Sequence, residues 1–80
     1  MNYQLELVVG TTITPLTDPS PLLMALFPHA DRIMAKHVEM GGRVREITTT
    51  KWQLTQPLHL KVSKNKAREG ILRIVQVEHG

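Results

Sequence analysis

The chain has 80 residues with a formal net charge of +3, and 41% of its residues are hydrophobic. A chain of this length forms one small domain, because a shorter unit buries too little apolar surface to offset the entropy of ordering it. It contains no cysteine, which excludes disulfide bridges and thiolate metal sites, and no apolar run approaches the roughly 20 residues that cross a bilayer. The first ten residues carry no Lys or Arg and do not resemble a secretory signal. We therefore expect a cytoplasmic protein that does not enter the membrane.

The first predicted element is a strand over residues 3–9. Apolar Tyr3, Leu5 and Leu7 alternate there with polar side chains, which is the period of a half-buried strand. Residues 10–19 are rich in Thr and Pro between few apolar residues, and this composition predicts a loop.

A helix is predicted next, because apolar residues recur at spacings of three and four over residues 22–38. Ser20 is the expected N-cap, and Pro21 suits the first helical position, where no N–H is needed. Pro28 interrupts this stripe, since it cannot donate a backbone hydrogen bond and its ring crowds the preceding turn. We expect either a kink or a break into two short helices at that point.

The character of the sequence changes after Gly41 and Gly42, a pair typical of a helix end. Residues 43–54 alternate except at Ile47, which predicts a strand split by a bulge or a short turn. Residues 58–62 and 71–77 alternate as well. The sequence therefore predicts an α+β domain of order β-α-β-β-β, in which a small antiparallel sheet packs on one helix.

The charge is unevenly distributed between the two halves. Residues 1–42 carry two Lys or Arg against four acids, a balance of −2, whereas residues 43–80 carry eight against three, a balance of +5. Such an asymmetry suggests an anionic partner, and a strand ribbon with a basic turn can follow nucleic-acid phosphates. The simpler alternative is a solvated surface, because charged turns and strand edges are common.

Our leading hypothesis is a small non-enzymatic binding or accessory module whose basic C-terminal hairpin contacts nucleic-acid phosphates. Arg73 lies on the last strand of the same predicted meander but outside the candidate set. The candidate residues are Arg43, Arg45, Lys51, Lys61, Lys64, Lys66 and Arg68.

Trp52 has two interpretations. Exposed, it would stack on a base or anchor a protein partner, and buried, it would be the largest core residue. The core is favoured, because Trp52 has the same parity as Val44 and Leu54. With one Trp, one Tyr and one Phe, the chain also lacks the several aromatic residues of an RNA-recognition sheet.

We find no constellation for catalysis or metal binding. His29 and His37 are eight positions apart, too far along one helix to share an ion, and no Ser, His and Asp trio or paired carboxylates are evident. Gly41 and Gly42 lack the strand before and helix after them that a phosphate loop requires. We expect no enzyme activity, no cofactor and no metal.

The alternative hypothesis is a protein-binding regulatory or inhibitory module, of the kind that phages and plasmids encode as accessory proteins. It would act through the helix around Met24 to Lys36, since Met24 falls off the apolar stripe. It would otherwise act through an uncovered sheet edge, either the first or the last strand, with a homodimer as one form of that pairing.

Overall fold

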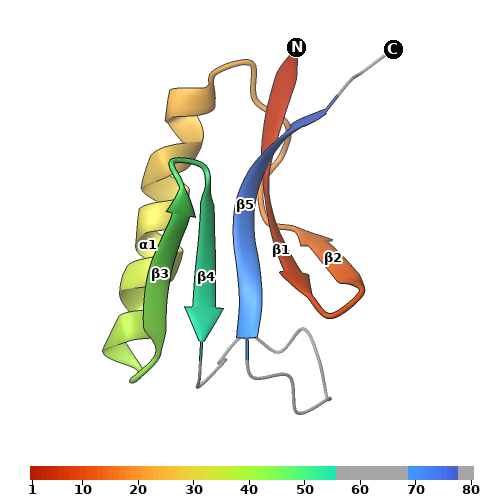
Figure 1. The fold of residues 1–80 in the computed structure, drawn as a ribbon. Coiled ribbons are helices and arrows are strands. Elements are labelled where there is room, and N and C mark those ends of the chain that lie inside the picture. The colour runs from red at the N-terminus through yellow and green to blue at the C-terminus, as the bar shows by residue number, and fades with distance from the viewer. Residues whose placement is uncertain (56–68, 78–80) are drawn as a thin grey trace.

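The computed structural model describes residues 1–55 and 69–77. In this part the chain forms one antiparallel sheet of five strands, with a single helix packed against one face (Figure 1). The predicted α+β class is confirmed. The predicted strand 58–62 lies outside the described residues. Within those residues, no helix is both long enough and apolar enough to span a bilayer.

The strands run in the spatial order β2-β1-β5-β4-β3. Their bounds are β1 (Asn2–Val9), β2 (Thr12–Pro15), β3 (Arg43–Thr48), β4 (Lys51–Thr55) and β5 (Glu69–Val77). The last strand is therefore central, paired with β1 on one side and with β4 on the other. The edges of the described sheet are β2 and β3, so the prediction of an uncovered edge at the first or last strand is wrong. β1 alternates, with Leu5 and Leu7 on the face toward α1 and Gln4 and Glu6 on the other, whereas β5 carries apolar residues on both faces, as at Ile71 and Leu72.

A short strand stands where the sequence predicted a loop. Val9 pairs with Thr12 and Val8 with Ile13, so β1 and β2 form a hairpin across Gly10, which has φ 61°. The prediction failed because Thr12 and Ile13 are both exposed, which leaves no apolar alternation to detect. Pro15 ends the strand at the sheet edge, where a missing N–H is tolerated.

The helical segment begins as a 3-10 turn, η1 (Leu23–Leu26), and continues directly as α1 (Phe27–Glu39). Pro28 lies in the first turn of α1, where its missing N–H costs no intrahelical bond. The sequence predicts a kink or a break at Pro28, and the structure has a change from 3-10 helix to α-helix next to it.

Ser20 does not cap this segment, and that prediction is wrong. Its backbone instead forms an isolated bridge, in which the Tyr3 N–H donates to the Ser20 carbonyl at 2.7 Å and the Ser20 N–H donates back at 2.8 Å. Its hydroxyl accepts from the Leu22 N–H at 3.2 Å, one residue before η1 starts. The extended backbone of the bridge places Ser20 too early in the chain to cap the helix.

The C-terminal end of α1 is closed by the two glycines, as predicted. The Gly42 N–H donates to the His37 carbonyl at 2.8 Å, and the Gly41 N–H donates to the Val38 carbonyl at 3.0 Å. Gly41 has φ 96°, the left-handed conformation that this pair of bonds requires. The chain is thereby turned from α1 into β3.

The core lies between the helix and the sheet, where alternate residues of β1, β4 and β5 meet α1. Trp52 is 6% exposed and packs edge-on against Phe27, with ring centroids 6.3 Å apart, which confirms the core interpretation. The buried apolar residues are Leu5, Leu7, Val9, Leu26, Ala30, Trp52, Leu54, Leu72 and Ile74.

Candidate functional site

The face of the sheet turned away from α1, called the open face below, is formed by the alternate residues that the core does not use. Cross-strand register partners point to the same face, because side chains alternate along each strand. The described candidate cations therefore share the open face with Arg73. Their rows across the strands are Arg43–Thr55–Glu69, Arg45–Gln53–Ile71 and Thr48–Lys51–Arg73.

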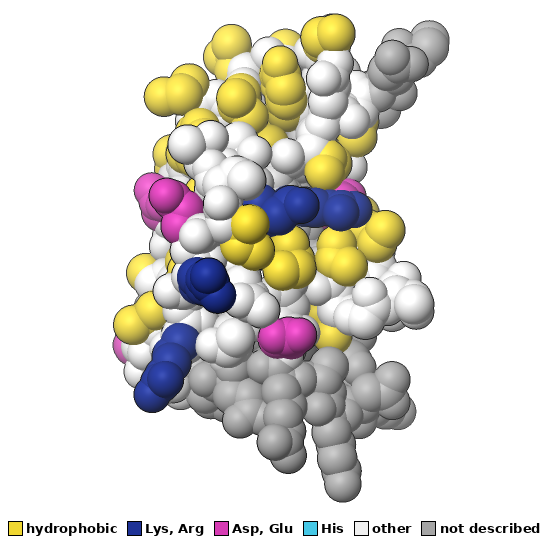
Figure 2. All heavy atoms as spheres, in the orientation of Figure 1, with side chains coloured by type: hydrophobic (Ala, Val, Ile, Leu, Met, Phe, Trp, Pro, Cys, Tyr) yellow, Lys and Arg dark blue, Asp and Glu magenta, His cyan; other side chains and the backbone are white. Residues whose placement is uncertain are grey.

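These cations form a diagonal line that crosses β5, β4 and β3, and we call it the basic track. It consists of Arg73, Lys51, Arg45 and Arg43. With strands about 4.8 Å apart and alternate residues about 6.8 Å apart, the track is about 20 Å long. Figure 2 shows the dark-blue side chains running from the middle of the open face toward its lower left.

A β-bulge decides which residue lies opposite Lys51. The register runs from Glu46↔Trp52 to Thr48↔Lys51 and skips Ile47, which is 48% exposed. Thr48 thus takes the place beside Lys51 that a regular ladder would give to Ile47. The bulge, together with the turn at Thr49 and Thr50, confirms the predicted interruption and keeps a bulky apolar side chain out of the basic track.

Arg73 is held by an ion pair within the sheet. Its Nε donates to Oε1 of Glu6 at 2.6 Å, and the two side chains are 32% and 11% exposed, respectively. Glu6 is the register partner of Arg73 and is flanked by Pro15 on β2, which explains its burial. Glu6 therefore offsets much of the charge of Arg73.

The other three cations of the track make no ion pair with an acid in the described part of the chain. Arg43 and Arg45 are exposed and Lys51 is half-buried. Glu69, in the same row as Arg43, accepts a hydrogen bond from Nε2 of Gln53 at 2.9 Å. Arg43, Arg45 and Lys51 therefore make the track a positive strip.

The remainder of the open face is aliphatic near β2. Val8, Ile13 and Ile71 form a continuous row, in which Ile13 is 53% exposed. The basic track is thus confined to the β3 side of the sheet, with Glu6 and this aliphatic row as its boundary.

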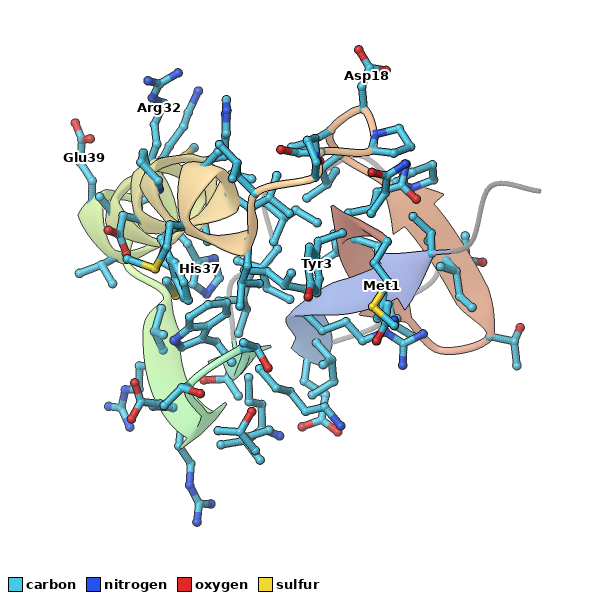
Figure 3. All side chains as sticks on the ribbon, turned by 90° about the horizontal axis from the view of Figure 1, so that it is seen from above. Met1, Tyr3, Asp18, Arg32, His37 and Glu39 are labelled. Carbon is cyan, nitrogen blue, oxygen red and sulfur yellow. The ribbon has the colours of Figure 1, made fainter. Side chains whose placement is uncertain are left out.

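The outer surface of α1, by contrast, carries both signs of charge. Asp31, Arg32, Lys36 and Glu39 are all exposed along the helix. Figure 3 shows Arg32 and Glu39 projecting from the helix away from the sheet. The exposed charges of α1 cancel, whereas the described part of the open face has four cations against Glu6 and Glu69.

His37 has a structural role at the end of α1. It is 6% exposed, points from the helix into the interior (Figure 3), and donates from Nε2 to the Thr55 carbonyl at 2.6 Å. A carbonyl only accepts, so Nε2 carries the proton. Across residues 1–55 and 69–77, no three His, Asp or Glu side chains gather closely enough to hold a metal ion.

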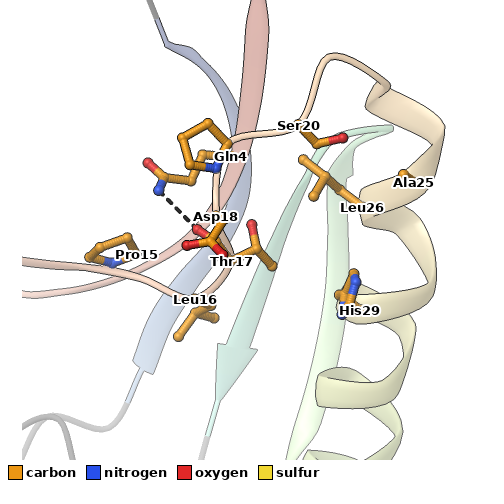
Figure 4. A pocket seen from close by; sticks show the side chains of 10 residues that line it. Gln4, Pro15, Leu16, Thr17, Asp18, Ser20, Ala25, Leu26 and His29 are labelled. Atoms are coloured by element: carbon orange, nitrogen blue, oxygen red, sulfur yellow. Dashed lines mark hydrogen bonds between the residues drawn. The ribbon is translucent and has the colours of Figure 1, made fainter. Parts of the chain in front are cut away.

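A pocket of about 670 Å³ opens between the segment after β2 and the start of the helix (Figure 4). Leu16 and Leu26 contribute apolar lining, and His29 lies on the helix side. Nε2 of Gln4 donates to the Thr17 carbonyl at 2.9 Å, and the Thr17 hydroxyl accepts from the Leu5 N–H at 3.2 Å. These hydrogen bonds fix the segment to β1, and Asp18 and His29 are the ionisable side chains that line the pocket.

Of the candidate residues, the structure brings together Arg43, Arg45 and Lys51. Arg73 was missing from that set, although its position between Leu72 and Ile74 signals a side chain on the face opposite the core. The remaining candidates, Lys61, Lys64, Lys66 and Arg68, lie outside the described residues. Compared with known proteins, the chain matches no family model, no curated protein and no solved structure.

Proposed function

We propose that this protein is a non-enzymatic binding module that contacts nucleic-acid phosphates through the open face. The contacts are made by Arg43, Arg45 and Lys51, together with Lys61, Lys64, Lys66 and Arg68. The observation that carries the proposal is the register of β3, β4 and β5, which gathers cations from separate strands into one track. The other four candidates belong to residues 56–68, which connect Thr55 to Glu69. These two residues are register partners and lie in the row of Arg43.

The chemistry of the track suits phosphate. Three of its four cations are arginines, whose planar guanidinium binds phosphate oxygens through two parallel hydrogen bonds. The described part of the open face has four cations against Glu6 and Glu69, a net positive charge, whereas the exposed charges of α1 cancel. Interspersed charges of both signs, as on α1, are the pattern expected of a surface that only maintains solubility. Each phosphate that a cation neutralises releases counterions, so binding must weaken as salt is raised.

The first test is a matched pair of double variants. Arg43→Gln/Arg45→Gln removes two exposed cations from the basic track, and Arg32→Gln/Lys36→Gln removes two exposed cations from α1. The salt slope is the steepness with which the logarithm of the binding constant falls as the logarithm of the salt concentration rises, and each phosphate contact contributes about 0.9 to it. The track variant is therefore expected to lower this slope for duplex DNA by about 1.8, and to lower the affinity by about 60-fold at 0.1 M salt. The helix variant has the same net charge and is expected to bind as the parent does. Fluorescence anisotropy over a salt series measures both quantities.

Equal losses in the two variants would mean that only net charge matters, which would refute a specific role of the open face. If the parent protein binds no nucleic acid even at low salt, the proposal is wrong.

A second test predicts a gain of binding. Glu6→Gln removes the negative charge that offsets Arg73, so the affinity for duplex DNA is expected to rise by up to about 8-fold at 0.1 M salt. Glu39→Gln, an equal charge change on the outer surface of α1, is the control and is expected to leave the affinity within about 2-fold of the parent. A variant that failed to fold would not bind more tightly, so a gain of affinity cannot be caused by unfolding. A Glu6→Gln variant with the affinity of the parent would exclude Arg73 from the contact.

The alternative function, a protein-binding module, has one observation in its favour. Leu22 and Met24, beside and within η1, are 66% and 75% exposed. Hydrophobic side chains gather at the upper end of the molecule in Figure 2, the end where the helical segment begins in Figure 1. A partner held there would be unaffected by Arg43→Gln/Arg45→Gln, which distinguishes the two functions.

A further inference from the structure

Building on the proposed function, we propose that the ligand of the open face is double-stranded DNA. The basic track holds the phosphates of one DNA strand, and the contact does not read the base sequence.

The position of the aromatic residues argues against a single-stranded ligand. Proteins that bind single strands stack the bases on aromatic side chains, which supply much of the affinity. The chain has only three such rings, Tyr3, Phe27 and Trp52. Trp52 is 6% exposed among the core residues, and Tyr3 and Phe27 are partly buried against the same core. None of the three is on the open face, so bases laid across the track would find no platform.

The shape of the track favours a nucleic acid whose phosphate backbone is already ordered and densely charged. Duplex DNA carries one charge per about 1.7 Å of its axis, with both strands counted. The track is a single line about 20 Å long, bounded by Glu6 on β1 and by the aliphatic row of Val8, Ile13 and Ile71. Such a line can follow one strand of a duplex, but it does not surround a flexible single strand.

The side chains between the cations are poorly placed to read bases. An amide side chain reads adenine through its carbonyl and its NH₂ together. Gln53 is the amide within the rows of the track, and its Nε2 already donates to Glu69 at 2.9 Å. Its neighbours Thr48 and Thr55 are short, so the cations reach the phosphates while bases remain out of contact.

The test compares three fluorescent DNAs with the full chain over a salt series. They are two 24-base-pair duplexes of unrelated mixed sequence and one oligothymidine of 24 nucleotides. The duplexes are expected to bind at least about 4-fold more tightly than the single strand at 0.1 M salt, because the contacts of Arg43, Arg45 and Lys51 alone contribute about 0.9 each on a duplex and about 0.7 on a single strand. The two duplexes are expected to agree within about 2-fold. Arg43→Gln/Arg45→Gln should lower the duplex slope by about 1.8.

Four other results would each refute a part of the proposal. Oligothymidine that binds as tightly as the duplexes, or more tightly, refutes the duplex as ligand and leaves the proposed function standing. A difference above 10-fold between the two duplexes refutes sequence-independent contact. No binding to any of the three DNAs at low salt refutes DNA as the ligand, and a lack of binding to RNA as well refutes the proposed function itself. Polyglutamate of the same charge as the duplexes serves as a control polyanion. If it binds as tightly as the duplexes, the face accepts any polyanion, and DNA is refuted as its ligand.

Discussion

Gly42→Ala is expected to destabilise the domain by about 3 kcal/mol. A Cβ at this position would lie 2.5 Å from Cδ2 of His37 and closer still to Nε2 and Cε1. The ring has no free space into which it can rotate, because it is buried and bonded to the Thr55 carbonyl. Alanine must therefore displace the imidazole, which breaks that hydrogen bond and opens the junction of α1, β3 and β4. Urea unfolding, followed by the fluorescence of the buried Trp52, measures the loss.

A double-mutant cycle separates this clash from a backbone effect. Gly42 is not among the glycines with positive φ, so alanine can adopt its backbone conformation. Once His37→Ala has removed the ring, adding Gly42→Ala is expected to change the free energy of unfolding by less than about 1 kcal/mol. Gly10→Ala is the matched control, since φ 61° strains alanine there with no atom within 4 Å, and its cost should not depend on His37. An unchanged cost of Gly42→Ala in the His37→Ala background would disprove the clash.

Leu72→Ala is expected to lower the free energy of unfolding by about 3–5 kcal/mol. Leu72 is 0% exposed and lies between its register partners Leu7 and Trp52, at the centre of the sheet. Truncation leaves a cavity that neither neighbouring strand can fill, because β5 is hydrogen-bonded on both sides. A domain of this size is stable by roughly 4–12 kcal/mol, so this loss is a large fraction of the total. Urea denaturation monitored by circular dichroism gives the value.

The same substitution at Leu22 provides the control. Leu22 is 66% exposed, and its truncation is expected to change stability by less than about 0.5 kcal/mol. If the costs of the two substitutions differ by less than about 1 kcal/mol, Leu72 does not lie in a packed core and the arrangement of the two layers is wrong.

The elements with a strong local pattern could be predicted from the sequence. The first and last strands alternate apolar and polar residues, and Gly41 with Gly42 marks the end of α1, so these were found within about two residues. The strand at Thr12 could not be found, because an exposed edge strand has no buried face and thus no period. The Ser20 cap failed because the bridge to Tyr3 depends on a contact between distant segments.

The candidate site was predictable in part for a related reason. Arg43 and Arg45 are two positions apart on one strand, so their common face follows from the sequence alone. The place of Arg73 beside Lys51 depends on the register between β4 and β5, and its pairing with Glu6 depends on the register between β1 and β5, which are more than 60 positions apart in the chain. No local pattern encodes that register, because it is set by which apolar faces meet in the core.

The central position of β5 also governs the order in which the protein can be made. In residues 1–55 and 69–77, β5 is the last strand along the sequence, and β1 and β4 are joined only through their ladders with it. A growing chain on the ribosome therefore cannot join β1 and β4 into one sheet before β5 has been made. Contacts between such distant segments also slow folding, because a long loop has to close before they form. Chaperone protection during synthesis would matter more for this fold than for one whose neighbouring strands are consecutive.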